Sequence, residues 1–102
     1  MEMKDAIRSC LAGLSRREIV SGFNQDAAVL IPVFQLDNEP HFLLTLRTEE
    51  VPTHKGQISF PGGMREGKES LQDTALRETF EEVGIDRSRI EILDRFHDYM
   101  SI

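Results

Sequence analysis

The chain has 102 residues, of which 39% are hydrophobic and 29% are charged, a composition typical of one soluble globular domain. Its formal net charge of −6 argues against a general nucleic-acid-binding protein, which normally carries a basic patch, and no apolar run is as long as a membrane span. A phosphorylated small molecule is not excluded, because a few local cations and a bound metal offset an unfavourable overall charge.

The N-terminal segment predicts a helix over residues 5–14, because apolar side chains recur there at helical spacing. Cys10 lies on this stripe and is interpreted as a small buried residue. As the only cysteine, it forms no internal disulfide. The first residues also lack the basic-then-apolar pattern of a secretory signal, so we expect a cytoplasmic protein. Residues 15–21 are left open as a further helical turn or a loop.

A first hairpin is expected in the middle of the chain. Residues 27–34 form a continuous apolar run that predicts a buried strand, and Pro32 within it indicates a bulge or an edge position. Turn-forming residues follow at 37–40, and residues 41–47 are expected to return as the second strand.

Two further strands are expected on either side of a helix. Residues 57–60 alternate as a strand does, until the Pro-Gly-Gly segment at 61–63 is expected to break any regular element. Residues 90–96 predict a return to strand. The side chains assigned to the core are Leu43, Leu44 and Phe60.

The clearest predicted helix covers residues 70–83. Ser70 is placed to cap its N-terminus, with Asp73 three residues later as in a capping box, and Gly84 is placed to end it. Residues of one half of the helical wheel are expected to pack inward. They are Leu71, Ala75, Leu76, Thr79, Phe80 and Val83.

Three carboxylates gather on the other half of this helix. Glu78 and Glu82 lie four residues apart and stack on one face, with Glu81 on the adjoining side. Their repulsion favours protonation unless a divalent cation or Arg77 offsets it, and magnesium prefers such hard oxygen ligands. The alternative interpretation is a solvated acidic helix face, and for Glu69 a surface acid near a helix start.

The acidic helix belongs to a longer pattern of fixed spacing over residues 63–85. Gly63 is followed by five residues and Glu69, and then by seven residues and the pair Arg77-Glu78. The remaining fixed positions are Glu81, Glu82, Gly84 and the apolar Ile85. This spacing resembles the Nudix box. Thr79 is the one departure, because the pattern has a large aliphatic residue there, and it affects local packing rather than the acidic positions.

The resemblance implies an α/β fold of the α+β kind, a Nudix αβα sandwich with a mixed sheet, incomplete at its C-terminus. Residues 1–102 would then be the N-terminal portion of the domain. It also implies metal-dependent hydrolysis of a nucleoside diphosphate linked to another group. The expected ligands of Mg²⁺ or Mn²⁺ are Glu78, Glu82, Glu81 and the carbonyl of Gly63, and the expected catalytic residues are Glu81, Arg77 and Glu78.

A second pattern lies upstream, over residues 43–63. It comprises Leu43-Leu44-Thr45-Leu46-Arg47-Thr48, Gly56 and Phe60-Pro61-Gly62-Gly63, and it resembles the signature of the coenzyme A pyrophosphatase branch. Thr48 departs mildly from that signature, whereas Pro52 replaces an arginine that could have faced a phosphate. The implied substrate-binding residues are Arg47, His54, Lys55, Gly56, Phe60, Gly62 and Gly63.

This branch implies coenzyme A or acyl-coenzyme A as substrate, with 3′,5′-adenosine diphosphate and 4′-phosphopantetheine, or its acylated form, as products. A Nudix hydrolase of another nucleotide is the alternative. The guanidinium of Arg47 suits phosphate, but a surface or structural ion pair is the alternative expectation for Arg47. The alternative for His54 is a loop histidine near solvent that binds no substrate. No nucleic acid or membrane partner is expected, and a homodimer is left open.

The stop at Ile102 motivates a hypothesis of a different class. Complete Nudix domains continue with further strands, a second helix and often another metal ligand or a general base. A chain without them leaves an apolar sheet edge open. The alternative to an active hydrolase is therefore an inactive truncated module that binds a metal or a partner.

Overall fold

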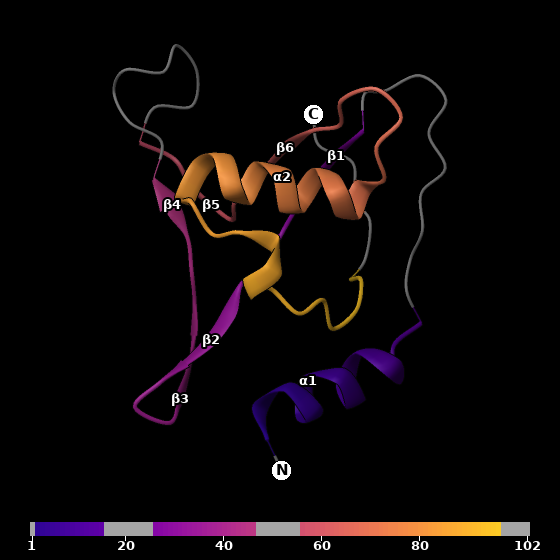
Figure 1. The fold of residues 1–102 in the computed structure, drawn as a ribbon. Coiled ribbons are helices and arrows are strands. Elements are labelled where there is room, and N and C mark those ends of the chain that lie inside the picture. Colours follow the sequence, from indigo (N-terminus) through magenta and orange to yellow (C-terminus); the bar gives the residue numbers. More distant parts are fainter. Residues whose placement is uncertain (1, 16–25, 47–55, 97–102) are drawn as a thin grey trace. The chain divides into compact units, whose positions relative to one another are not determined.

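The computed structural model describes residues 2–15, 26–46 and 56–96, which contain two α-helices, six short strands and one 3₁₀ turn (Figure 1). These residues fall into two compact units, and residues 91–96 belong with 2–15 in the smaller one. The mixture of helices and antiparallel strand pairs confirms the expected α+β class. Neither of the helices found in these ranges is long and apolar enough to cross a bilayer.

The smaller unit contains α1 (Met3–Ala12), which confirms the predicted N-terminal helix. None of its residues is buried, so the expectation that Cys10 would be a buried residue is wrong. Lys4 and Arg8 lie one turn apart and both pair with the carboxylate of Glu91. The hydrogen bond from Arg8 and the charge of Lys4 lower the pKa of Glu91.

The larger unit is built around α2 (Leu71–Val83), which contacts an antiparallel pair made of β1 (Ala27–Val29) and β6 (Gly62–Met64) (Figure 1). The Pro-Gly-Gly segment was expected to break regular structure, and this was wrong because its glycines open β6. A Cβ atom at Gly62 would lie 2.3 Å from the carbonyl oxygen of Ala28. Glycine therefore allows the two strands to approach at this point.

The apolar run over residues 27–34 is not one buried strand, as was expected. It is divided between β1 and β2 (Val33–Leu36), and Pro32 lies in the break between them, outside either strand. Pro32 has no N–H to donate, but its carbonyl oxygen accepts from the backbone N–H of Leu43 at 3.1 Å. Val29 is 50% exposed, so the run does not form a continuous buried element.

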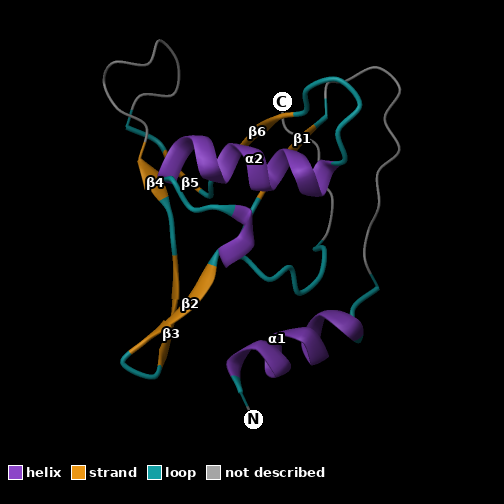
Figure 2. Ribbon diagram, in the orientation of Figure 1, coloured by secondary structure: helices purple, strands orange, loops and turns teal. Residues whose placement is uncertain are grey.

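The predicted hairpin forms around its expected turn, but the expected second strand over residues 41–47 is wrong as a single element, because residues 39–42 and 45–46 belong to separate strand pairs. β2 pairs with β3 (Glu39–Phe42), and the two strands are joined by Asp37 and Asn38. Both residues have a positive φ, 53° and 64°, as a two-residue hairpin turn with the right-handed twist requires. Figure 2 shows this ribbon and the smaller pair beside it, which is formed by β4 (Thr45–Leu46) and β5 (Ile58–Ser59).

Few apolar side chains are buried in these strands. Leu44 is 51% exposed, so its assignment to the core is wrong, whereas Leu43 and Phe60 are half-buried. Phe42, Leu44 and Leu46 alternate along the chain and are all exposed.

The boundaries of α2 agree with the predicted helix. The hydroxyl of Ser70 accepts from the backbone N–H of Asp73 at 3.0 Å, and Gly84 ends the helix with φ 75°. The carboxylate of Asp73 pairs with Arg87 at 2.8 Å. Thr74, Ala75, Leu76 and Thr79 are the buried residues of α2, whereas Phe80, expected to pack inward, is 54% exposed.

The chain after α2 differs from the prediction. A 3₁₀ turn, η1 (Arg87–Arg89), follows the helix, and residues 90–96 are irregular rather than a strand. A segment becomes a strand only when its backbone hydrogen-bonds to a neighbouring strand, and none of the six described strands pairs with residues 90–96.

Candidate metal and active site

Arg77 is the centre of the candidate site. One guanidinium nitrogen, Nη1, donates to Glu78 Oε1 at 2.9 Å and to Glu81 Oε2 at 3.1 Å. The other, Nη2, donates to Glu69 Oε1 at 2.8 Å and to the carbonyl oxygen of Met64 at 2.9 Å. These contacts join α2 to the loop and strand that precede it, and the hydrogen bond with Glu69 is the largest of the causes that raise the pKa of Arg77.

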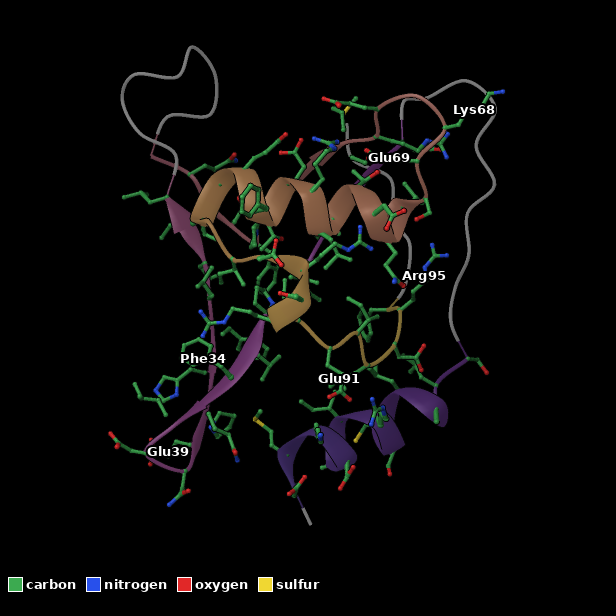
Figure 3. The ribbon with its side chains drawn as sticks, viewed as in Figure 1. Phe34, Glu39, Lys68, Glu69, Glu91 and Arg95 are labelled. Carbon is green, nitrogen blue, oxygen red and sulfur yellow. The ribbon has the colours of Figure 1, made fainter. Side chains whose placement is uncertain are left out.

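Glu69 lies on the loop between β6 and α2 (Figure 3). Its carboxylate accepts from Arg77, from the backbone N–H of Glu66 at 2.9 Å and from the hydroxyl of Thr74 at 2.8 Å. The Arg77 hydrogen bond is the largest of the causes that lower the pKa of Glu69, to about 2, while burial opposes the shift. Glu69 is therefore ionised at neutral pH and forms a charge-assisted pair with Arg77.

The two glycines of β6 bring backbone against the acidic side chains. A Cβ atom on Gly63 would lie 2.6 Å from Cδ of Glu78 and 2.8 Å from each of its carboxylate oxygens. The backbone N–H of Gly62 donates to Glu82 Oε2 at 3.0 Å. Glu82 is thus hydrogen-bonded to β6 through Gly62, and a larger residue at position 63 would overlap with the carboxylate of Glu78.

The donor chemistry of this cluster fits a hard divalent cation. Glu78, Glu81 and Glu82 supply carboxylate oxygens beside the backbone of Gly63, and Mg²⁺ binds through few carboxylates while keeping several waters. Among the residues that the structure describes, no group of three His, Cys, Asp or Glu side chains lies close enough together to hold a metal ion. Arg77 Nη1 instead bridges Glu78 and Glu81, and a bound cation would share or replace that contact.

Comparison with known families decides what this cluster belongs to. The NUDIX domain family matches residues 24–101, which is most of the chain. The chain belongs to the Nudix family. The matched residues include the segment that carries Gly63, Glu69 and Arg77 to Glu82, whose spacing resembles the Nudix box.

Two kinds of relative resemble this Nudix chain. Nudix hydrolase 3 of Caenorhabditis elegans is 42% identical over 72 residues, which make up 71% of the chain and 30% of that protein. An uncharacterized Nudix hydrolase, NudL, of Yersinia pestis is 42% identical over 83 residues, 80% of the chain and 41% of that protein. The NudL protein of Yersinia pseudotuberculosis matches equally well. The chain therefore spans less than half the length of these curated relatives.

In the structure Arg77 contacts Glu78 and Glu81, and Gly62 contacts Glu82, whereas the metal, catalytic and substrate roles of these residues stay predictions. Phe60 contacts Phe42 edge to face, with ring centroids 6.2 Å apart, so it packs within the strands. Gly56 is exposed with φ 73°, a conformation that favours glycine. Three predicted substrate residues lie outside the described part of the chain, namely Arg47, His54 and Lys55.

Sequence reasoning missed Thr74 as a member of the network. Its side chain is fully buried and its hydroxyl contacts Glu69. The available signal was its place three residues before Arg77, on the same face of α2. The backbone contributions of Glu66 and Met64 carried no such signal, because any residue type supplies an N–H or a carbonyl there.

Proposed function

We propose that this Nudix chain hydrolyses the diphosphate linkage of a nucleoside diphosphate derivative with the help of a divalent cation. The observation that carries the proposal is the guanidinium of Arg77, which holds Glu69, Glu78 and Glu81 together beside β6. Acidic side chains gathered around one arginine and a glycine strand suit a cation and the phosphate oxygens that it binds.

Each residue of the site has a distinct role in this proposal. Glu78, Glu81, Glu82 and the carbonyl of Gly63 would hold Mg²⁺ or Mn²⁺. The ion would polarise a phosphoryl oxygen and lower the pKa of a water molecule. Arg77 orients the carboxylates before any ligand arrives. The side chain of Glu81 is 53% exposed, compared with 19% for Glu78, so Glu81 is the more accessible carboxylate for receiving a proton from water.

The proposed substrate is coenzyme A or an acyl derivative, cleaved to 3′,5′-adenosine diphosphate and 4′-phosphopantetheine or its acylated form. Support for this comes from the pattern over residues 43–63 rather than from the described geometry. Arg47, His54 and Lys55 remain the residues predicted to meet its phosphates. A cytoplasmic location, supported by the single cysteine, is part of the same proposal, and a homodimer stays an open prediction.

Product masses from coenzyme A in ¹⁸O-labelled water test this proposal directly. Hydrolysis breaks one P–O bond of the diphosphate and places one oxygen from water on one of the two products. With Mg²⁺ or Mn²⁺ present, we expect both products, with the label on a single one. If coenzyme A, acyl-coenzyme A, NADH and nucleoside triphosphates all remain intact, the chain is not a hydrolase of these compounds.

Glu82→Gln should abolish metal-dependent turnover without unfolding the chain. The amide oxygen of glutamine can still accept from Gly62 N–H, but the negative charge that would bind the cation is lost. Initial rates measured with each metal, together with circular dichroism, check this result. Glu39→Gln removes a carboxylate from the hairpin strand β3 and should retain the parent rate (Figure 3). Activity that survived in the Glu82→Gln variant would disprove the metal assignment.

A module that binds metal without turnover is the second candidate function. It rests on the same acidic side chains around Arg77, which would suit a cation whether or not a substrate is cleaved. In that case the chain would take up Mn²⁺ and release no product from any of the four substrate classes. Parallel titration and turnover measurements on one preparation distinguish the two functions.

A further inference from the structure

Two fully buried threonines lie on α2, and their hydroxyls make different contacts. The hydroxyl of Thr79 donates to the carbonyl oxygen of Ala75, one turn earlier, at 2.7 Å. The hydroxyl of Thr74 lies 2.8 Å from Glu69 Oε1 and 3.1 Å from the carbonyl oxygen of Ser70. A hydroxyl has one proton, and the ionised carboxylate is the closer and stronger acceptor, so Thr74 donates to Glu69.

Glu69 Oε1 is held from three directions. The backbone N–H of Glu66 approaches it from the loop, the hydroxyl of Thr74 from the buried side of α2, and Arg77 from further along the helix. Thr74 is the one neutral side chain among these donors, and it is fully buried. Its position is therefore fixed by packing, whereas a partly exposed arginine needs its partner to select one rotamer.

The orientation of Arg77 is passed on to the acidic cluster. Nε and Nη2 are engaged by Glu69, which leaves Nη1 aimed at Glu78 and Glu81. We propose that Thr74 is a positioning residue of the metal site, whose hydroxyl fixes Glu69, through it Arg77, and through Arg77 the carboxylates that receive the cation. This inference rests on the proposed function, because it assigns Thr74 a part in the same site.

Thr74→Val removes the hydroxyl and keeps the side chain's shape. Glu69 then loses its buried hydrogen-bond donor, so its carboxylate no longer holds the Arg77 guanidinium in one orientation. Loss of an indirect contact of this kind typically lowers metal affinity by about 10- to 100-fold, and we expect the dissociation constant for Mn²⁺ to rise by about tenfold. Thr74→Ser restores the hydroxyl without the methyl group and should recover most of the affinity.

The experiment measures free Mn²⁺ by electron paramagnetic resonance during titration of the whole chain. Thr79→Val is the matched control, because it removes an equally buried hydroxyl whose partner is only the helix backbone. Urea unfolding of each variant verifies that it is folded under the titration conditions. If Thr74→Val does not fold, Thr74→Ala takes its place. Wild-type affinity in the folded Thr74 variant, or an equal loss in Thr79→Val, would overturn the proposal.

A second measurement keeps this inference separate from the proposed function. If the wild-type chain takes up no Mn²⁺, the metal site fails, but the ordering of Arg77 is still observable without metal. Its Nε–H gives a nitrogen-15 signal that exchanges slowly with water when both carboxylate bonds are made. We expect that signal to broaden or vanish in Thr74→Val and to persist in Thr79→Val. An unchanged signal in both variants would show that Thr74 does not position Arg77.

Discussion

Single backbone positions decide whether acidic side chains of α2 reach β6. At Gly63 the space that a Cβ atom would fill is occupied by the carboxylate of Glu78, at 2.6 Å from its Cδ. At Gly62 the backbone amide is the donor to Glu82. Because these residues have no side chain, the carboxylates of α2 can lie close to the backbone of β6.

Gly63→Ala should move the Glu78 carboxylate away from β6, because the new methyl group would overlap with it. A misplaced ligand typically costs about 10- to 100-fold in metal affinity, and we expect Mn²⁺ binding to weaken within that range. Isothermal titration calorimetry measures the change. Gly13→Ala is the control, since the nearest atom to its new methyl group would be 3.8 Å away. Unaltered binding in Gly63→Ala would mean that Glu78 is not a ligand.

At the scale of elements, α2 could be predicted from the sequence almost residue by residue, because its signals are local. Ser70 and Gly84 mark its ends through contacts with neighbours in the chain. The strands could not be predicted as well. Whether residues 27–34 form one strand or two depends on β6, whose residues pair with Ala27–Val29 from more than thirty positions further along the chain, and on how little of the run is buried.

The same distinction separates the parts of the candidate site. The spacing of Arg77, Glu78, Glu81 and Glu82 places them on one helix, so their grouping followed from helical geometry. The bond from Gly62 to Glu82 could not be inferred in this way, since it joins α2 to a strand twenty residues earlier in the chain.

Ser70→Ala should weaken α2 by removing the hydroxyl that accepts from Asp73 N–H. The loss of such a cap costs about 1 kcal/mol in the free energy of unfolding. Urea denaturation followed by circular dichroism measures this cost. Ser70→Asp supplies a different oxygen at the same place and should retain the parent stability. Equal stability in the Ala variant would show that the cap does not contribute.

At the scale of the whole molecule, few apolar side chains are sheltered. Within the described ranges, Ala75 and Leu76 are the buried hydrophobic residues, whereas twelve large hydrophobic side chains are exposed. The charged network around Arg77 joins α2 to the preceding loop and to β6. We expect the stability of the larger unit to respond to pH through this network.

Glu69 predicts the direction of that response. Its pKa falls from 4.5 to about 2 on folding, so its stabilising contribution is complete above pH 4.5 and is lost as the pH drops towards 2. Urea midpoints measured from neutral pH down to about pH 2 should decline over this interval, while Arg77 stays charged. Glu69→Gln should be less stable at neutral pH and should approach the parent chain in acid. A constant difference across the range would contradict the assignment.

The hydrogen bond from Gly62 to Glu82 gives the chain a natural reporter. The amide of this glycine faces a carboxylate on the helix, and its residue also sits opposite Val29 in the strand pair. A change in the charge or position of Glu82 would alter the chemical shift of the Gly62 amide proton that it accepts. The chemical shift of this amide proton would report cation binding at the acidic cluster. The amides of neighbouring residues in β6 would report whether the strand pair stays folded, so one spectrum separates binding from unfolding.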